Sequence, residues 1–421
     1  MQLSAYLKRY ITSILTASAV IFSAQSLAGG FQLWEQDAAG VGDYHAGAAA
    51  EADSAATAFY NPAGVTRLKH QQISFGAALI GLETNFTGTA NGVPVTSAAG
   101  DTTNIVPNFS YALPFANQWA FAFSVTSPFG LSTKYADVPF VNTLATKTEL
   151  DTVNLNPSIA YAINQYLSVG VGLDVLYGNA IYNSDVFIPL KTDLSGWNAG
   201  YNAGLLVQFT PATRAGISYR SAITVSATGS SSSDSFDIPP VPVNTTATAK
   251  FPLPATTILS LYHDFTPRLT LMTTAFYTQW SVFKELIISN MATPTGPGVV
   301  ALNENYRDTW NLALGGKYKV NQHIWLDAGF GHDETPTRTG YRDIRLPDND
   351  HYAASLGVDI QPKPGFIWSM GWTHFFVPNT TIDNTLSNDA TKTSTPLPPT
   401  IGLGVVNGNV NVYGMQLSID I

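Results

Sequence analysis

The sequence predicts an all-β fold, a transmembrane antiparallel β-barrel of about 14 strands with a mostly helical N-terminal hatch plugging its lumen. Three observations lead to this fold class. Charged residues make up only 12% of the chain and aromatic residues another 12%, which suits a membrane protein better than a globular domain. Apolar and polar residues alternate over runs of ten or more residues. Short and long connections between these runs follow one another strictly.

The composition also excludes several classes of protein. After the first thirty residues, no apolar run reaches the roughly 18 residues that a spanning helix needs, so membrane insertion requires a barrel. The formal net charge of −9 argues against nucleic acid as a partner. The chain has no cysteine, which rules out disulfides and cysteine-bound metals. We expect neither a cofactor nor a metal.

Residues 1–28 have the three parts of a secretory signal peptide. Lys8 and Arg9 are basic, about 14 apolar residues follow them, and Ser26-Leu27-Ala28 supplies the small residues that a signal peptidase needs. We therefore expect cleavage after Ala28. An uncleaved membrane anchor is the alternative, but the apolar run is short for that role.

Residues 29–69 differ from the rest of the chain because small residues, mostly alanine, dominate them. The spacing predicts short helices, one of them at 55–59, which Asp53 or Ser54 can cap and Asn61-Pro62 ends. The segment also carries large apolar side chains that need burial: Phe31, Leu33, Trp34, Phe59 and Tyr60. We predict that it forms a compact hatch inside the barrel. A solvated leader is the alternative.

Residues 70–421 are predicted to form the barrel, because their side chains alternate between two faces. In the segment 197–209, Trp197 and Tyr201 share one face with other apolar residues, while Asn202 lies on the other. The same alternation recurs in the segments 167–178, 311–320, 352–360 and 411–421. We expect the apolar face to meet lipid and the glycine- and asparagine-rich face to line a lumen. A soluble β-sandwich would alternate in the same way over shorter strands.

The connections between the strands give the strand count. Six are short and lie at 114–118, 163–165, 210–213, 264–267, 320–322 and 361–365. Seven are longer polar stretches and lie near 88–102, 133–148, 186–194, 229–246, 289–304, 336–349 and 379–405. They alternate, long then short, and predict about fourteen strands. An even number with short turns on one rim and long loops on the other is typical of outer-membrane barrels.

Several groups of residues recur in order along the mature chain. They are Gly30-Phe31-Gln32-Leu33 with Asn61-Pro62-Ala63-Gly64, Ser127-Pro128-Phe129-Gly130, Asn156-Pro157-Ser158-Ile159-Ala160-Tyr161, Asp308-Thr309-Trp310 with Leu314-Gly315, and Asp333-Glu334-Thr335-Pro336 with Arg345-Leu346-Pro347-Asp348. As an ordered set they resemble the FadL family of outer-membrane transporters for long-chain fatty acids and hydrocarbons. The resemblance covers essentially the whole mature chain.

The resemblance implies a hatch in a fourteen-stranded barrel and a hydrophobic ligand that leaves sideways through a kink in the third strand. It implies that Phe31 lies at the ligand pocket and that Asn61, Pro62 and Ala63 form a hatch motif beside the kink. We place the kink at Pro128 and Gly130, since proline removes a ladder donor and glycine permits a bend. The alternative is that these two residues end the strand at a loop. The sequence departs from the family at position 351, a histidine where we expect arginine.

Basic residues on the predicted lumen face are candidates for binding a fatty-acid carboxylate, together with Phe31 for the acyl chain. They are Arg214, Arg220, Lys317 and Lys319, of which the first three are our ligand-binding candidates. A guanidinium can bind a carboxylate with two hydrogen bonds. The alternative is that these bases pair with hatch acids such as Glu35, Asp37 or Asp43.

We predict an outer-membrane transporter of a Gram-negative bacterium that takes up hydrophobic molecules, long-chain fatty acids first, by diffusion. An aromatic-hydrocarbon channel, a general porin and a surface adhesin are the alternatives. An enzyme is not expected, because neither GxSxG nor HExxH occurs and the seven histidines are scattered. The expected partners are the hydrophobic ligand and membrane lipid, and we expect a monomer.

Overall fold

The computed structural model describes residues 29–135, 138, 140–185, 188–394 and 400–421. The predicted signal peptide, 1–28, lies outside the described residues. Among the described residues, no helix is both long enough and apolar enough to cross a membrane.

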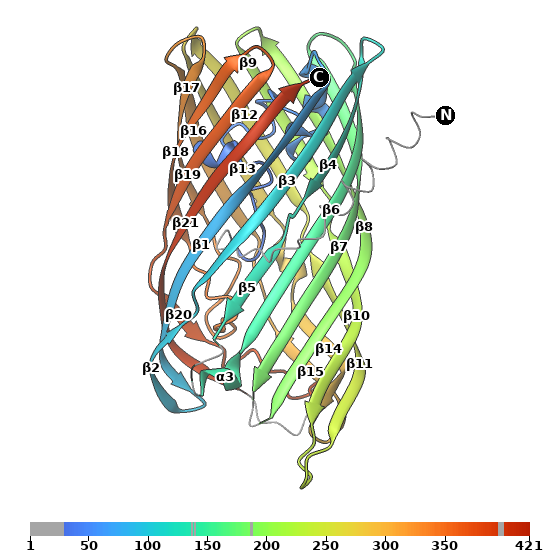
Figure 1. The fold of residues 1–421 in the computed structure, drawn as a ribbon, viewed down its shortest axis with the longest axis vertical. Helices are drawn as coiled ribbons and strands as arrows, with labels where there is room; N and C mark the ends of the chain where they lie inside the picture. The colour runs from blue at the N-terminus through green and yellow to red at the C-terminus, as the bar shows by residue number, and fades with distance from the viewer. Residues whose placement is uncertain (1–28, 136–137, 139, 186–187, 395–399) are drawn as a thin grey trace, which may run out of the picture.

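The strands form one closed antiparallel barrel (Figure 1). They are β1 (Gln72–Ala90), β2 (Val93–Ala99), β3 (Thr102–Phe115), β4 (Trp119–Thr126), β5 (Gly130–Lys134), β6 (Lys147–Ala162), β7 (Leu167–Asp185), β8 (Pro189–Thr210), β9 (Thr213–Arg220), β10 (Ile223–Asp234), β11 (Pro242–Leu253), β12 (Thr256–Thr266), β13 (Leu269–Thr278), β14 (Glu285–Thr293), β15 (Gly296–Asn303), β16 (Thr309–Lys319), β17 (Ile324–Asp333), β18 (His351–Lys363), β19 (Phe366–Phe376), β20 (Thr380–Asp383) and β21 (Gly402–Asp420). The last strand pairs with the first from Gln72↔Asp420 to Ala90↔Gly402, and this pairing closes the barrel.

These segments make up 14 strands of the barrel wall, as the sequence predicts. Six wall strands are each interrupted and therefore form two segments, namely β4/β5, β9/β10, β11/β12, β13/β14, β15/β16 and β19/β20. The remaining segment, β2, is a short flap that pairs with β1. Two helical turns lie between wall segments, α3 (Val141–Leu144) and η3 (Trp280–Val282).

All six predicted short turns lie at one end of the barrel, the upper end in Figure 1, and the long connections lie at the other. Five of the segments predicted as long polar loops are wrong in extent, since those near 88–102 and 379–405 contain β2 and β20. β8 already begins at Pro189, β10 and β11 continue the wall to Asp234 and from Pro242, and only two residues separate β14 from β15. Their serine and threonine side chains look like loop residues, yet strands that project beyond a membrane meet water on both faces and lose the apolar alternation.

The alternation of side chains has the predicted sense. Trp197 and Leu173 each expose 61% of their surface on the outside of the barrel, while Asn202 exposes 3% and faces the lumen. The outer face is therefore apolar and the inner face carries the polar residues, as a wall that meets lipid requires.

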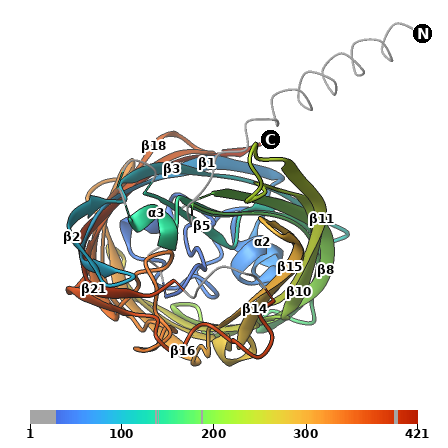
Figure 2. The same cartoon turned by 90° about the horizontal axis from the view of Figure 1, so that it is seen from below.

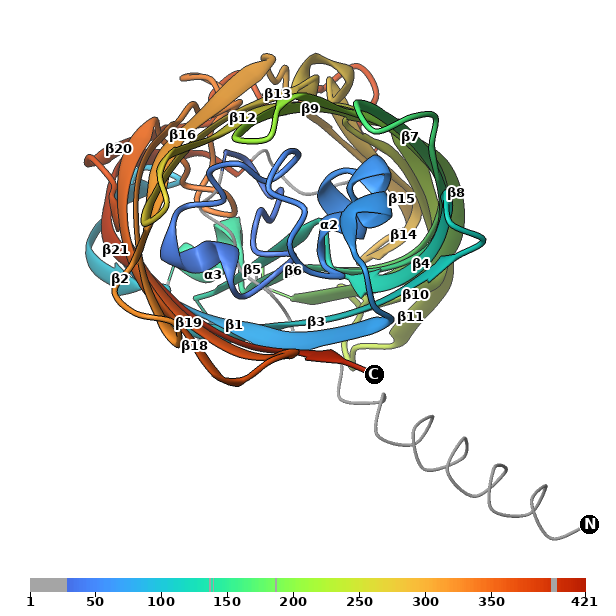
Figure 3. The same cartoon turned by 90° about the horizontal axis from the view of Figure 1, so that it is seen from above.

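Residues 29–71 lie inside the ring of strands, as both end-on views show (Figures 2 and 3). Their helical turns are short: η1 (Gly40–Gly42), α2 (Thr57–Tyr60) and η2 (Pro62–Arg67). Hydrogen bonds fasten this segment to strands all round the wall. They include Ala38 N to Gln416 Oε1 (3.1 Å), Gly47 N to Thr274 Oγ1 (2.8 Å), Ala49 N to Ser260 Oγ (3.0 Å), Ala55 N to Gln72 Oε1 (2.6 Å) and Thr373 Oγ1 to Val41 O (2.7 Å).

Candidate functional site: a broken strand beside an apolar lumen

The third strand of the wall is broken where the sequence predicts a kink. β4 ends at Thr126 and β5 begins at Gly130, partway along the barrel (Figure 1). Within the described residues, the ladder between β3 and the third strand stops at Phe109↔Val125, and β5 pairs only with β6. The wall therefore has an interrupted ladder between β3 and β5.

The break has the geometry of a one-residue bulge. Thr126 lies opposite Asn154 of β6, and Gly130 lies opposite Asp151, so four steps along the third strand oppose three steps along β6. One extra residue in a strand bends it and interrupts its ladder. Pro128 lies at the centre of the bulge and has no N–H to give to a neighbouring strand.

The N-terminal segment takes the place of a neighbouring strand at the break. Leu33 N donates to Pro128 O (2.9 Å), Gly130 N donates to Phe31 O (2.9 Å), and Gln32 pairs with Phe129. The amide of Gln36 binds both backbone groups of Ser127, at 2.8 and 2.7 Å. The backbone groups at the kink are therefore bound from inside the barrel, by the chain that begins the hatch.

Phe31 lies at the centre of a cluster of aromatic rings beside the break. Its ring centroid is 4.6 Å from that of Trp280, 5.6 Å from Phe283, 6.2 Å from Phe129 and 6.4 Å from Tyr306. Only 5% of Phe31 is exposed. We call these five rings the aromatic cluster. Edge-on contacts at such distances each stabilise the packing by about 0.5–1.5 kcal/mol beyond burial.

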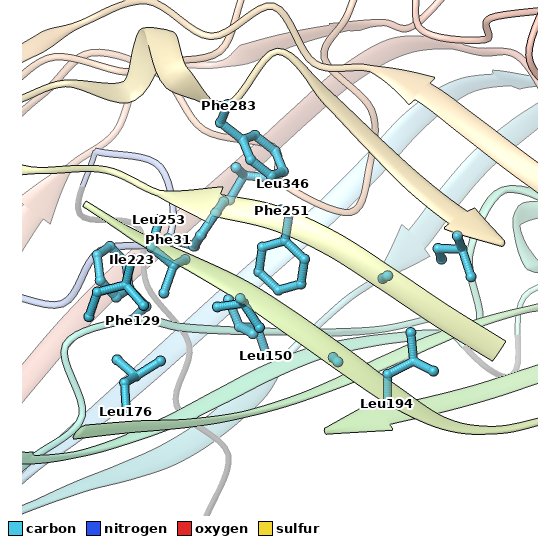
Figure 4. Close-up of a cluster of buried hydrophobic side chains, with 14 of the residues drawn as sticks. Phe31, Phe129, Leu150, Leu176, Leu194, Ile223, Phe251, Leu253, Phe283 and Leu346 are labelled. Atoms are coloured by element: carbon cyan, nitrogen blue, oxygen red, sulfur yellow. The ribbon is translucent and has the colours of Figure 1, made fainter. Parts of the chain in front are cut away.

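From the aromatic cluster, buried apolar side chains continue along the lumen toward the long-loop end (Figure 4). They come from β6, β7, β8, β10, β11, β14 and the connection that follows β17: Leu150, Leu176, Leu194, Ile223, Val225, Phe251, Leu253, Met291 and Leu346. An open diffusion channel has a polar, water-filled interior. This part of the lumen is instead suited to an apolar solute.

The three predicted ligand-binding bases bind protein groups. Arg214 donates to the carbonyls of Ala50 (2.6 Å) and Glu51 (2.5 Å), and its guanidinium lies over the ring of Tyr262. These two carbonyls belong to the hatch. Arg214 therefore binds the hatch, as the alternative interpretation expects. It binds backbone carbonyls, however, and not a hatch carboxylate.

Arg220 and Lys317 are likewise engaged. Arg220 forms an ion pair with Asp174 of β7 and donates to Phe59 O in the hatch (2.8 Å). Lys317 Nζ lies 2.9 Å from a carboxylate oxygen of Glu51 in the hatch and 3.3 Å from one of Asp359 in β18. Neither base faces the apolar part of the lumen with its charge uncompensated. The hatch acids Glu35, Asp37 and Asp43, named as possible partners, do not form these contacts.

The hatch motif rests on a track of glycines. Asn61 Nδ2 donates to Ala49 O (2.7 Å) and to Leu205 O of the wall (2.9 Å), and its side-chain oxygen accepts from Ala63 N (3.1 Å). The wall residues against Asn61, Pro62 and Ala63 are Gly170, Gly204 and Gly216 of β7, β8 and β9. The motif therefore packs on these three strands, and the expectation that its tip faces the kink stays a prediction. Pro62 and Pro128 do line one small cavity together.

A buried acidic pocket that the sequence did not reveal binds the backbone of Gly29 and Gly30. Gly29 N donates to Asp333 (2.7 Å), and Gly30 N donates to Asp348 (2.8 Å), which is fully buried. Burial raises the pKa of Asp348, in the connection between β17 and β18, to about 6. His351, where arginine was expected, packs its ring on Phe375, and its Nδ1 lies 2.8 Å from the carbonyl oxygen of Asn349.

Comparison with known proteins decides the family. A model described as outer membrane protein transport protein (OMPP1/FadL/TodX) matches residues 19–420. The chain belongs to this family. Members of the OMPP1/FadL/TodX family are outer-membrane transporters, so the chain is an outer-membrane protein of a Gram-negative type. The short turns accordingly face the periplasm and the long connections the outside.

Individual OMPP1/FadL/TodX proteins resemble the chain over nearly its full length. The long-chain fatty acid transport protein of Salmonella typhi is 28% identical over 385 residues, which cover 83% of this chain and 88% of the relative. Outer membrane protein P1 of Haemophilus influenzae is 26% identical, with 98% of this chain and 99% of the relative covered.

Solved structures share the fold. A FadL homologue of Pseudomonas aeruginosa superposes with a TM-score of 0.81 at 20% identity and covers 93% of this chain and 99% of its own. The Ralstonia pickettii toluene transporter TbuX gives 0.68 at 16% identity, with coverages of 89% and 95%. Identities this low show the common barrel alone.

Proposed function

We propose that this protein takes up long-chain fatty acids and that they leave the barrel sideways through the broken third strand. A ligand lands among the long extracellular connections, enters the apolar lumen and reaches the aromatic cluster around Phe31. It then passes between β3 and β5 into the membrane. Diffusion down a concentration gradient is sufficient for a solute that partitions into apolar surroundings.

The break in the third strand carries this proposal. A closed ladder would block sideways exit, and a polar channel through the hatch would not suit an acyl chain. At the break, the ladder between β3 and β5 is missing, and the N-terminal segment holds the kink from inside. A shift of Phe31 and Gln36 away from Ser127–Gly130 would open a passage between an apolar lumen and lipid.

The role of the bases is part of the proposal. Because Arg214, Arg220 and Lys317 are engaged with hatch or wall groups, we assign them to holding the hatch closed and not to binding the ligand carboxylate. Phe31 keeps its predicted role at the ligand pocket, and Asn61-Pro62-Ala63 is assigned to seating the hatch. Residues 1–28 as signal peptide, 29–69 as hatch, 70–421 as barrel and a monomeric state belong to the same proposal.

Uptake assays in a deletion strain separate the two ligand classes. The proposal predicts that the plasmid-borne gene restores uptake of radiolabelled oleate. Aromatic hydrocarbon is the second candidate, because solved toluene transporters share the fold. Restoration of toluene uptake without oleate uptake would show that the ligand is an aromatic hydrocarbon and not a fatty acid. Restoration of neither would favour a surface adhesin.

A planar-bilayer recording separates the plugged transporter from a general porin. We expect the intact protein to conduct almost no ions, because the hatch fills the lumen. Deletion of 30–66 is expected to open a steady conductance. Steady conductance of the intact protein would contradict the plugged barrel and support the porin.

A further inference from the structure

The outer wall carries a concave apolar groove far from the broken strand. The groove lies over β8, β9, β12 and β13 and has a volume of about 450 Å³. Its lining is Leu205, Val207, Ala215, Gly216, Ile217, Leu259, Ser260, Leu261, Thr273 and Ala275.

The groove forms because small residues interrupt a surface of large ones. Ala215 and Ala275 are only half exposed and form its floor, and exposed leucine and isoleucine side chains of the neighbouring positions form its rim. The polar atoms near it are satisfied. Thr273 donates its hydroxyl to Ala313 O (2.8 Å), and the hydroxyl of Ser260 is bound within the wall and accepts from Ala49 N. The groove therefore offers apolar contact and no free polar group.

The position of the groove identifies its occupant. It lies between the exposed aromatic residues Phe209 and Phe265 on the periplasmic side and Tyr201 and Tyr219 on the other. Aromatic girdles mark the two interfaces of a membrane barrel, so the groove lies within the hydrocarbon layer. It is continuous with the surface that already meets lipid. The hydrocarbon layer of the membrane consists of acyl chains, so an acyl chain is the group that can fill the groove.

The inner side of the same strip of wall holds the hatch. Gly216 lies directly against Ala49 O, and Ala49 N donates to Ser260 Oγ (3.0 Å). Asn61 donates to Leu205 O of β8. A single layer of backbone therefore separates the groove from the residues on which the hatch is seated.

We propose that this groove is a binding site for one acyl chain of a membrane glycerophospholipid, packed on the wall behind the seat of the hatch. The lipid site is separate from the proposed exit between β3 and β5. It is independent of the transported ligand, so it can be tested whatever that ligand is. Bound lipid keeps water out of the hollow and fills it with the dispersion contacts that a void would lose.

The first experiment uses the unaltered protein. The full chain is reconstituted in nanodiscs of phosphatidylethanolamine that contain a trace of the same lipid with a photoreactive acyl chain. Labelled peptides are then mapped after illumination. We expect peptides of β8, β9, β12 and β13 to carry about tenfold more label than the equally lipid-facing β17, as a 1.4 kcal/mol preference would give. Even labelling around the barrel would overturn the proposal.

The second experiment fills the groove. Ala215→Leu with Ala275→Leu is expected to lower the phosphatidylethanolamine retained by the detergent-purified protein about tenfold, as read by native mass spectrometry. Ala328→Leu, at an exposed position on the outer face of β17, is the matched control and is expected to retain lipid normally. Equal retention by the filled variant would contradict the site. Oleic acid is titrated alongside. Binding of oleic acid in the groove in place of phospholipid would contradict the assignment of the groove to a glycerophospholipid.

Discussion

Arg214 shows how a predicted ligand residue acquires another role in the fold. Its buried guanidinium donates to two carbonyls of the hatch, each over a distance of 2.5–2.6 Å, and these bonds tie the hatch to β9. A hydrogen bond from a charged group contributes about 1.5–3 kcal/mol. Removal of the side chain leaves both carbonyls without their partner.

Arg214→Ala is expected to loosen the hatch by about 3 kcal/mol without weakening ligand binding. Hydrogen exchange of the amides at 47–60 measures the first effect, and oleate affinity measures the second. Arg268→Ala, in the exposed turn before β13, is the control. A large loss of oleate affinity with unchanged exchange would show that Arg214 binds the ligand after all.

Asp348 makes the anchoring of the N-terminal segment depend on pH. Its folded pKa of about 6 lies above the ordinary 3.8, because burial disfavours the charged form. The stabilisation from the protonated carboxyl is therefore complete below about pH 4 and is lost as the pH rises through about 6. A shift of about two pKa units corresponds to about 3 kcal/mol at most.

Exchange of the amides at 29–36, corrected for the intrinsic rate, is expected to rise between pH 4 and pH 7 in the unaltered protein. Asp348→Asn is expected to reduce this pH dependence, since an amide does not titrate there. Glu35, whose pKa burial raises to about 7, and Asp333, whose pKa burial also raises, account for the dependence that remains. An identical pH profile in the variant would rule out Asp348 as the titrating group.

The residue scale is where sequence reasoning was weakest. Phe31 could be placed from its family motif, and its burial is explained by four aromatic partners. Those partners come from the break before β5, from η3 and the residue after it, and from the connection after β15, and no local pattern links positions so far apart. Gln36 gave no signal, and the family motif that contains Asp333 did not show its partner, because a polar side chain shows its partner only after the barrel has closed.

At the scale of elements, the packing of the hatch on the wall depends on the absence of side chains at wall glycines as much as on hydrogen bonds. A Cβ atom at Gly204 would overlap the side chain of Asn61, and one at Gly216 would overlap Ala49 O. The glycine track on β7, β8 and β9 therefore lets the hatch backbone approach the wall. The sequence showed glycine on the lumen face but could not show which strands receive the motif.

Gly204→Val is expected to displace the hatch and raise the ion conductance of the protein in planar bilayers. The matched control is Gly81→Val on β1, where the nearest heavy atom to the added Cβ is 3.8 Å away, an ordinary contact. Conductance as low in Gly204→Val as in the control would mean that the motif tolerates a shifted seat.

The strands themselves were largely predictable, and the reason is physical. In a wall that meets lipid on one face, apolar and polar side chains must alternate with a period of two. The membrane-spanning part of each strand can therefore be predicted from the sequence. The six short turns followed from the same alternation. The extensions of β8, β10 and β14 beyond the membrane were not predicted, because both of their faces meet water or other protein and no alternation is imposed on them.

At the scale of the whole molecule, three features form one path. The apolar lumen begins below the long connections, the aromatic cluster lies at its inner end, and the broken third strand lies beside that cluster. The hatch lies inside the ring of strands on the periplasmic side (Figure 3). A solute that enters from outside therefore reaches an apolar pocket. The nearest interruption around this pocket is the broken strand in the wall, and the hatch separates the pocket from the periplasm.

Uptake, as proposed, depends on sideways exit of the ligand through the one-residue bulge of the third strand. After deletion of Pro128, three residue steps along the third strand oppose three steps along β6. Thr126 and Gly130 then keep their partners on β6, and the strand can run straight beside β3. Deletion of Pro240, in the exposed tip between β10 and β11, removes one proline without touching the wall. Both proteins are compared for folding by the heat-induced mobility shift of the barrel on a gel.

Oleate uptake by cells that carry each deletion is the decisive measurement. We predict that the Pro128 deletion folds and still binds oleate, yet lowers uptake at least about tenfold, a 1.4 kcal/mol change in the barrier to passage. The Pro240 deletion is predicted to take up oleate at the normal rate. Normal uptake by a folded Pro128 deletion would contradict the account, because the ligand would then have another way out of the barrel.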